Sequence, residues 1–81
     1  ARAMGVQDVD KMSQAEYRQA CIDVVQKLGA DVQIPRHVSE LGVKEKDFDS
    51  LAKSAMADAC TPGNPRAVTH DQIVEIYKSI F

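Results

Sequence analysis

The segment CTPGNPR, residues 60–66, carries side chains that could do chemistry on a stretch of stiff backbone. Cys60 offers a thiol, Asn64 an amide and Arg66 a guanidinium, while two prolines restrict the chain between them. Rigid loops between helices often carry binding residues, because the flanking elements hold the side chains in place. The same composition also ends one helix and starts the next. The residues alone therefore leave two interpretations open, a loop that lines a site and a purely structural turn.

Ser50 is a second reactive group, in the triplet Asp49-Ser50-Leu51. This triplet is similar to the one in acyl carrier proteins, where the serine carries a phosphopantetheine arm at the start of a helix. Carrier proteins follow that serine with an acidic recognition helix, whereas here Lys53 follows and no acid appears before Asp58. An acyl carrier-like protein modified at Ser50 is one alternative, and an ordinary serine in a first helical turn is the other.

The sequence contains no complete metal-binding motif. Asp8-Val9-Asp10 begins like a calcium loop, but such a loop requires a glycine at the sixth position and a glutamate at the twelfth. Ser13 and Gln19 occupy those positions, so we expect no calcium site.

The histidines and cysteines are also poorly spaced for metal binding. His37 and His70 have no His, Asp or Glu at metal-binding spacing. Asp71 adjoins His70, but neighbouring residues in a helix point in different directions, so both histidines are interpreted as surface groups. Cys21 and Cys60 form no Cys-x-x-Cys pair, which indicates reduced thiols on packed helices. These patterns assign no catalytic, cofactor-binding or metal-binding residue.

The composition indicates one small soluble domain or a piece of a larger one, with 81 residues, 44% apolar, 27% charged and a net charge of -2. The lysines and arginines are scattered, which argues against nucleic acid as a partner. No apolar run approaches the roughly 20 residues that cross a bilayer, so no membrane partner is expected. Nothing resembles a signal peptide, and a cytoplasmic location is the default expectation.

The spacing of apolar residues predicts an all-α fold with three main amphipathic helices and a short connecting helix. The opening residues ARAMGV read as a last helical turn, with Gly5 as its left-handed cap. A capping box of Ser13 and Glu16 starts the first main helix, which runs to Leu28 and is stopped by Gly29. Its predicted apolar face contains Tyr17, Ala20, Cys21, Val24, Val25 and Leu28.

Three further helices complete the prediction. The connecting helix covers Ile34–Gly42, with Pro35 in its first turn. The second main helix runs from about Lys46 to Ala59, where the prolines of the 60–66 segment prevent its continuation. A capping box of Thr69 and Gln72 begins the last helix. The two predicted apolar faces contain Phe48, Leu51, Ala52, Ala55, Met56 and Ala59, and then Ile73, Ile76, Tyr77 and Ile80.

An ordered set of short motifs extends over essentially all 81 residues. They are Met4-Gly5-Val6, the helix from Ser13 to Leu28, Ile34-Pro35, Ser39-Glu40-Leu41-Gly42-Val43, Asp47-Phe48, Asp58-Ala59-Cys60, Gly63-Asn64-Pro65-Arg66 and Ile73-Val74-Glu75-Ile76-Tyr77. Taken in this order, they resemble the C-terminal region of the iron-dependent alcohol dehydrogenases, the family that includes lactaldehyde reductase and 1,3-propanediol dehydrogenase.

The resemblance implies that residues 1–81 are the C-terminal helical segment of a larger metal-binding domain, in an enzyme several times longer. Such an enzyme interconverts a primary alcohol and an aldehyde with NAD(P), and a divalent metal, usually iron (Fe²⁺), acts as a Lewis acid. In the family, an N-terminal α/β domain binds the cofactor, and an aspartate and three histidines bind the metal. Because those motifs precede this region, we expect the cofactor-binding domain and the metal ligands to be absent from this chain, which alone would be inactive.

The resemblance also implies a role for the 60–66 loop, which would fold towards the cleft between domains. Cys60 would shape the substrate pocket rather than act as a nucleophile, because hydride transfer needs no covalent intermediate. Gly63, Asn64, Pro65 and Arg66 would form a structural loop that fixes the final helix. The implied partners are the remainder of the same enzyme chain, a small alcohol or aldehyde, and a second copy in a homodimer. An autonomous helical interaction module, supported only by the amphipathic faces, is the remaining alternative.

Overall fold

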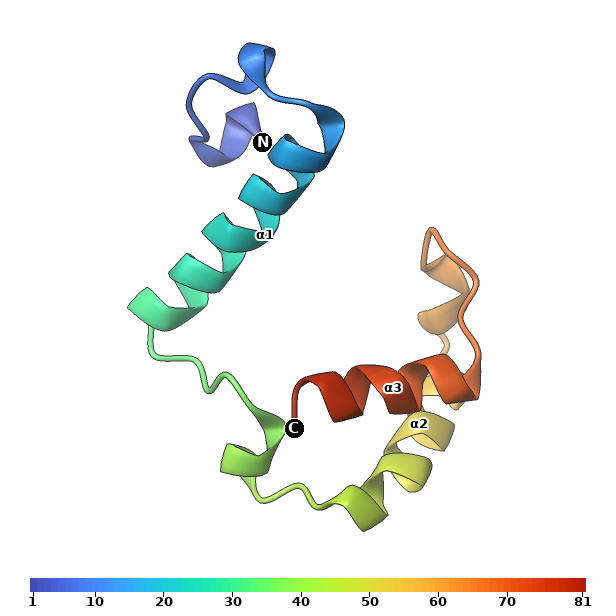
Figure 1. Ribbon diagram of the computed structural model, residues 1–81. Coiled ribbons are helices and arrows are strands. Elements are labelled where there is room, and N and C mark those ends of the chain that lie inside the picture. Colours follow the sequence, from blue (N-terminus) through green and yellow to red (C-terminus); the bar gives the residue numbers. More distant parts are fainter. The chain divides into compact units, whose positions relative to one another are not determined.

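The computed structural model describes all 81 residues and contains helices, turns and loops but no strands, so the all-α prediction is confirmed (Figure 1). The chain forms two compact units, residues Ala1–Pro35 and Arg36–Phe81. Its α-helices are α1 (Gln14–Asp31) in the first unit, and α2 (Phe48–Ala57) and α3 (His70–Ser79) in the second. None of them combines the length and the apolar character that crossing a lipid bilayer requires.

The first unit opens with two short 3₁₀ helices, η1 (Arg2–Met4) and η2 (Val9–Lys11). Gly5 follows η1 in the left-handed conformation, with φ of 85°, and its amide donates to the carbonyl of Arg2. The predicted turn with a glycine cap is therefore present, as a 3₁₀ turn.

The start of α1 forms only half of the predicted capping box. Ser13 Oγ accepts a hydrogen bond from the Glu16 amide at 3.2 Å, but the Glu16 carboxylate makes no return bond to the Ser13 amide. The prediction of a reciprocal box is wrong here. The helix still begins after Ser13, because one side-chain acceptor already satisfies one of the free amides of the first turn.

The end of α1 lies beyond Gly29, contrary to the prediction that this glycine stops the helix. The left-handed residue is instead Gln33, with φ of 61°. The Ile34 amide donates to the Gly29 carbonyl at 2.8 Å, and the Gln33 amide donates to the Ala30 carbonyl at 3.1 Å. These two bonds form a Schellman motif, which ends the helix at Asp31 and uses Gly29 only as an acceptor.

The connecting helix is shorter than predicted. The range Ile34–Gly42 contains a single 3₁₀ helix, η3 (Val38–Leu41), so Pro35 lies before it rather than in its first turn. The Glu40 carboxylate accepts hydrogen bonds from the amides of His37, at 2.8 Å, and of the residue before it, at 3.0 Å. This side chain fixes the helix start after His37.

The second main helix is also shorter than the predicted Lys46–Ala59. A 3₁₀ turn, η4 (Glu45–Asp47), leads into α2, which ends at Ala57. Asp58 has an extended backbone, and its carboxylate accepts a hydrogen bond from the Cys60 amide at 2.7 Å. This local turn competes with helix continuation and leaves Ala59 outside α2.

The last helix begins as predicted. Thr69 Oγ1 accepts from the Gln72 amide at 3.3 Å, and Gln72 Oε1 accepts from the Thr69 amide at 2.9 Å. The capping box is confirmed and fixes where α3 begins.

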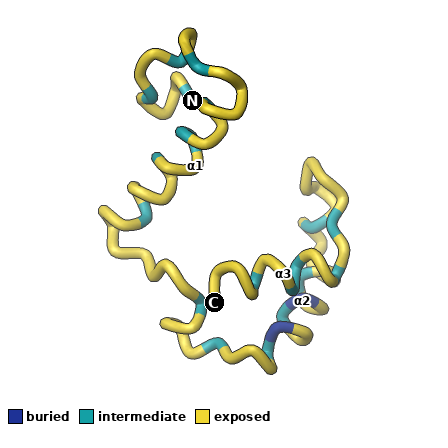
Figure 2. Tube along the Cα trace, in the orientation of Figure 1, coloured by how far each residue is buried: buried dark blue, intermediate teal, exposed yellow.

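The core of the second unit lies where α2 packs against α3. Its buried residues are Phe48 and Ala52, both on α2 (Figure 2). The Phe48 ring stacks on Tyr77 of α3 at 5.9 Å between centroids, and meets the edge of Phe81 at 5.4 Å. Ser39 Oγ also donates to the Phe81 carbonyl at 2.5 Å, which joins η3 to the residues after α3.

Much of the predicted apolar surface remains exposed. In the first unit no residue is buried. The side of α1 that carries Tyr17 is only half-buried. The large hydrophobic side chains that stay exposed are Met4, Ile22, Val25, Leu28, Val32, Ile34, Leu41, Met56, Ile76, Ile80 and Phe81. Such surface is typical of segments that pack against something else.

Candidate functional site

The 60–66 loop has a defined shape built from short-range hydrogen bonds. Its centre is a 3₁₀ turn, η5 (Thr61–Gly63), with Cys60 at the N-cap. Thr61 Oγ1 donates to the carbonyl of Ala55 in α2, and Asn64 Nδ2 donates to the carbonyl of Arg66. These bonds hold the loop on the end of α2 and close the turn that leads towards α3.

Cys60 lies on the surface of this loop with a free thiol. Its amide is held by Asp58, so the backbone is fixed while the side chain is exposed. Cys60 therefore does not lie on a packed helix, as the sequence suggested, whereas Cys21 is half-buried on α1. The reason is the early end of α2, which leaves Cys60 in the loop.

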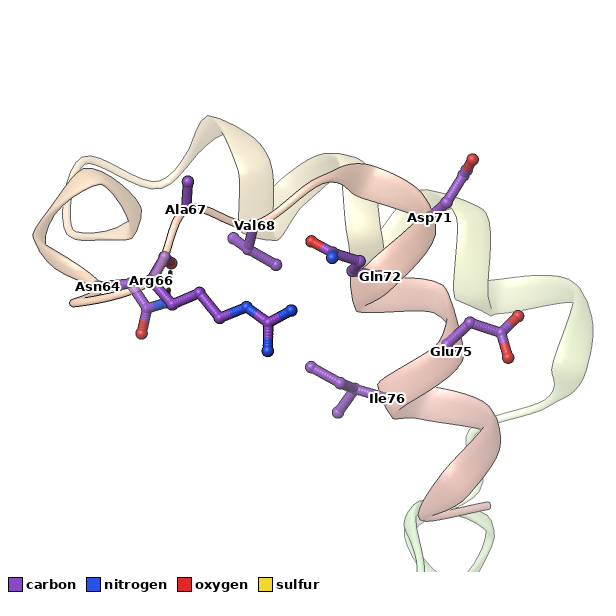
Figure 3. Close-up of a pocket in the computed structure, with 8 residues that line it drawn as sticks. All are labelled: Asn64, Arg66, Ala67, Val68, Asp71, Gln72, Glu75 and Ile76. Atoms are coloured by element: carbon purple, nitrogen blue, oxygen red, sulfur yellow. Dashed lines mark hydrogen bonds between the residues drawn. The ribbon is translucent and has the colours of Figure 1, made fainter.

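Two adjoining hollows flank the loop and α3. One, of about 450 Å³, is shown in Figure 3 and is lined by Asn64, Arg66, Ala67, Val68, Asp71, Gln72, Glu75 and Ile76. The other, of about 550 Å³, is lined by Asp58, Cys60, Thr61, Gly63, Asn64, Pro65, Val68, Ile73 and Ile76. The loop residues predicted from sequence, Cys60 and residues 63–66, thus line these two hollows.

The two hollows differ in their polar groups. In Figure 3 the Arg66 side chain extends from the loop towards Ile76 of α3, whereas Asp71 points away. The second hollow is lined by Cys60 instead. Both hollows share the polar Asn64 and the apolar Val68 and Ile76. This surface suits the apolar part of a ligand, or an apolar side chain of another segment.

His70 forms a polar cluster with two aspartates at the start of α3. Its Nδ1 lies 3.2 Å from Asp71 Oδ1, and its Nε2 lies 3.1 Å from Oδ1 of Asp49 in α2. The contact with Asp49 is an ion pair without hydrogen-bond geometry, so the buried Nε2 has no hydrogen-bond partner. The sequence interpretation of His70 as a surface group from which Asp71 points away was wrong. The ring is half-buried, Asp71 reaches it within the first helical turn, and the fold brings Asp49 to it.

The charges of this cluster shift two pKa values. The hydrogen bond to Asp71 is the main cause that raises the pKa of His70 above 6.5, and Asp49 adds to it. The hydrogen bond from Lys53, at 2.6 Å, is the main cause that lowers the pKa of Asp49 below 3.8, with His70 contributing. Both pKa shifts favour the charged forms of this pair, the protonated His70 and the ionised Asp49.

The residues of this chain do not fit an iron site. No group of three or more His, Cys, Asp or Glu side chains is placed to hold a metal ion. The only imidazole with acidic neighbours, His70, already faces a carboxylate at each ring nitrogen. The carboxylates of the calcium-like segment also have partners within the chain. Asp8 forms an ion pair with Lys11 at 3.8 Å, and Asp10 forms one with Arg2 at 2.5 Å.

Ser50 lies in the first turn of α2 and behaves as an ordinary helix-start serine. Its Oγ donates to the carbonyl of Asp47 at 2.9 Å. The geometry gives no support to the acyl carrier alternative.

The comparisons with known proteins identify the class. Residues 1–81 match the model of the Fe-containing alcohol dehydrogenase family, C-terminal. The chain belongs to this family, as the ordered motifs indicated.

Individual relatives agree with the family match. The chain is 47% identical over 77 residues to lactaldehyde reductase of Escherichia coli (strain K12), which covers 95% of this chain and 20% of that protein. It is 36% identical over 81 residues to 1,3-propanediol dehydrogenase of Citrobacter freundii, covering 100% of this chain and 21% of that protein. Alcohol dehydrogenase 4 of Schizosaccharomyces pombe is 48% identical over 61 residues, 75% of this chain and 14% of that protein. The chain spans about a fifth of the length of the first two relatives.

Sequence reasoning missed two features of this surface. Val68 and Ile76 line both hollows. Only Ile76 had been placed on a predicted apolar face, and nothing in the sequence indicated that this face lies beside the loop. The pairing of His70 with Asp49 was also missed, since it joins residues from separate helices. One feature of the sequence pointed to the position of His70. The capping box at Thr69 places this histidine at the start of α3, which is the end of the helix nearest the loop.

Proposed function

We propose that this chain is the C-terminal helical part of an oxidoreductase that interconverts a primary alcohol and an aldehyde. The observation that carries the proposal is the family match over residues 1–81. The names of the relatives, lactaldehyde reductase and 1,3-propanediol dehydrogenase, point to the same class of substrate. The cofactor we propose is NAD(P), and one relative is named NAD-dependent methanol dehydrogenase.

In this proposal, the remainder of the enzyme chain binds both iron and the dinucleotide. Bound there, they would supply a Lewis acid and a hydride carrier. The 81 residues would contribute packing and pocket shape, and the isolated chain would not be catalytic. We place the enzyme in the cytoplasm, where NAD(P) is abundant, and propose a homodimer as its assembly.

Cys60 is the residue we propose to shape the substrate pocket. Its support is geometric: the thiol is exposed on a fixed backbone, in a hollow with apolar walls. A thiol in that position would contact the carbon chain of a small alcohol and limit its length. It would not attack the substrate, because hydride transfer forms no bond to the protein.

The first test is the intact mass of the native protein that contains this sequence, followed by an assay of NADH- or NADPH-dependent aldehyde reduction with Fe²⁺. We expect a mass several times 8.9 kDa and turnover of small aldehydes. A native protein of 81 residues, or a longer one with no alcohol or aldehyde activity under these conditions, would overturn the proposal.

The role of Cys60 is tested by Cys60→Ala in the active enzyme, with Cys21→Ala as the matched control. We expect Cys60→Ala to raise KM for the preferred aldehyde several-fold and to shift preference towards longer substrates, while the melting temperature stays unchanged. Unchanged KM, kcat and substrate preference would show that Cys60 is not in the pocket.

A further inference from the structure

The outward side of α1 carries a seam with the spacing of a helix-packing surface. Arg18, Ile22, Val25, Gly29 and Val32 follow one another at alternating intervals of four and three residues. This is the spacing of residues that face one neighbouring helix. Here, however, Ile22 is 51% exposed, Val25 56% and Val32 58%.

From this seam, we propose that α1 docks against a helix from the preceding part of the same enzyme chain. That helix crosses α1 nearest to Gly29 and presents a carboxylate to Arg18. The inference rests on the proposed function in one respect, namely that the chain is the C-terminal part of a longer enzyme.

Gly29 marks the point of closest approach. A glycine inside a helix costs about 1 kcal/mol relative to alanine. Nothing in this unit requires that cost, because Gly29 has an ordinary helical backbone. Apart from its chain neighbours and the helix's own backbone, no atom lies within 4 Å of the position that a Cβ would occupy. A neighbouring backbone passing over that open position would give the glycine a reason.

Arg18 indicates the chemistry of the partner. It is the charged residue of the seam, and no acidic group of this chain forms an ion pair with it. The other basic residue of α1, Lys27, is paired with Asp31 at 2.6 Å. A guanidinium covered by an apolar surface must be paired, because an isolated buried charge is costly. The covering helix therefore needs a carboxylate about three turns from the point where it crosses Gly29, because Arg18 lies that far from the glycine along α1.

The comparisons indicate where the covering helix comes from. The chain matches the C-terminal family model and spans about a fifth of the relatives, so four fifths of such a protein lie outside these residues. A second copy of α1 is a poorer partner. In a symmetric pair crossing at Gly29, Arg18 would lie eleven positions, about 16 Å, from the crossing and would face no acid.

The experiment uses the full-length enzyme with the photo-crosslinking residue p-benzoylphenylalanine in place of Val25, and with the same residue in place of Gln26 as the matched control. After irradiation and digestion, we expect position 25 to crosslink to a peptide that precedes residue 1, and position 26 to do so much less. A crosslink to residues 36–81, a crosslink to a second copy, or no crosslink at position 25 would each overturn the proposal.

Two substitutions test the crossing point and the charge. Gly29→Ala should raise the helix content of the isolated 81-residue chain but lower the melting temperature of the full-length enzyme by several degrees. Arg18→Glu should lower that temperature too, and reversing the acid found in the crosslinked peptide should restore it, while Arg18→Lys should be much milder. A full-length Gly29→Ala enzyme that is more stable than the original would overturn the crossing at Gly29.

Aldehyde reduction is measured on the same preparations. An inactive protein with the expected crosslink would overturn the proposed function and leave the docking surface standing. An active enzyme with a different crosslink would overturn the docking surface alone.

Discussion

The Nε2 atom of His70 lies 3.1 Å from Oδ1 of Asp49, and this contact joins the start of α3 to the first turn of α2. Asp71 lies against the other ring nitrogen, and Lys53 binds the far side of Asp49. The four side chains form a chain of alternating charge beside the aromatic core of the second unit. The attraction between these side chains depends on whether the His70 imidazole is protonated.

The pKa of His70 should be measurably higher than 6.5 in the folded protein. Asp71→Asn should lower the His70 pKa more than Asp49→Asn does, because the hydrogen bond that the ring donates to Asp71 is the largest cause of the shift. A proton and carbon NMR titration of labelled histidine gives both values, and His37→Gln identifies the second histidine signal. A larger effect of Asp49→Asn would show that the ion pair between the helices dominates.

Stability of the second unit should fall as pH rises through the His70 pKa. A raised folded pKa means that the folded state binds the proton more tightly, so the stabilisation is fully present below the unfolded value and is lost above the folded one. The Asp49 pKa is lowered, so its contribution is lost on acidification. Urea unfolding against pH should show this, and His70→Gln should remove the loss on the alkaline side. A His70→Gln profile parallel to the original would contradict it.

Phe48→Ala should unfold the second unit. Removing a buried phenylalanine costs about 3 to 5 kcal/mol, which is comparable to the whole stability of a small domain. Met56→Ala, at a position that is 41% exposed, is the matched control and should cost little in the isolated chain. Chemical shifts of the Tyr77 ring report the loss of stacking. Equal effects of the two variants would show that the α2–α3 core is not the stabilising contact.

Thr69→Ala should destabilise α3 by about 1 kcal/mol, because it removes the acceptor of a capping bond. Thr69→Ser keeps the hydroxyl and should retain most of the stability. Ser13→Ala removes one equivalent bond, the one from the Glu16 amide, and should cost α1 a similar amount. Amide hydrogen exchange in the first turn of each helix measures both effects. No loss of protection in either alanine variant would show that these hydroxyl bonds do not stabilise the helix starts.

Gln33→Gly should stabilise the end of α1 by up to about 1 kcal/mol, because Gln33 has a left-handed backbone that glycine adopts without steric cost. Gln33→Ala is the control, since alanine keeps the strain. Thermal unfolding followed by circular dichroism checks the order of the two variants. A destabilising glycine would mean that the Gln33 side chain contributes a contact outside this unit.

The sequence by itself determined the elements whose cause is local. Thr69 and Gln72 are three residues apart, and their hydrogen bonds close without help from the rest of the chain, so the start of α3 was predictable. The left-handed cap at Gly5 was predictable for the same reason. The ordered motifs identified the family, since they depend on sequence order alone.

The ends of α1 and α2 depended on competition between alternative local hydrogen bonds, which residue spacing does not reveal. Gly29 looked like a helix end, yet the Schellman bonds placed the left-handed residue at Gln33. Asp58 stopped α2 by accepting from the Cys60 amide, which moved Cys60 from a helix to a loop. In both cases two local hydrogen-bonding arrangements were possible, and only the folded backbone showed which one forms.

Tertiary structure alone brought together residues from separate elements. Asp49 and His70 are 21 positions apart, and no periodicity links them; they meet because Phe48 and Ala52 pack α2 against α3. The hollow that contains Cys60 exists because Val68 and Ile76 fold beside the loop. Local hydrogen bonds can be predicted because their partners are a few residues apart in the sequence. Contacts between helices depend on which apolar faces meet, and only the folded chain determines that.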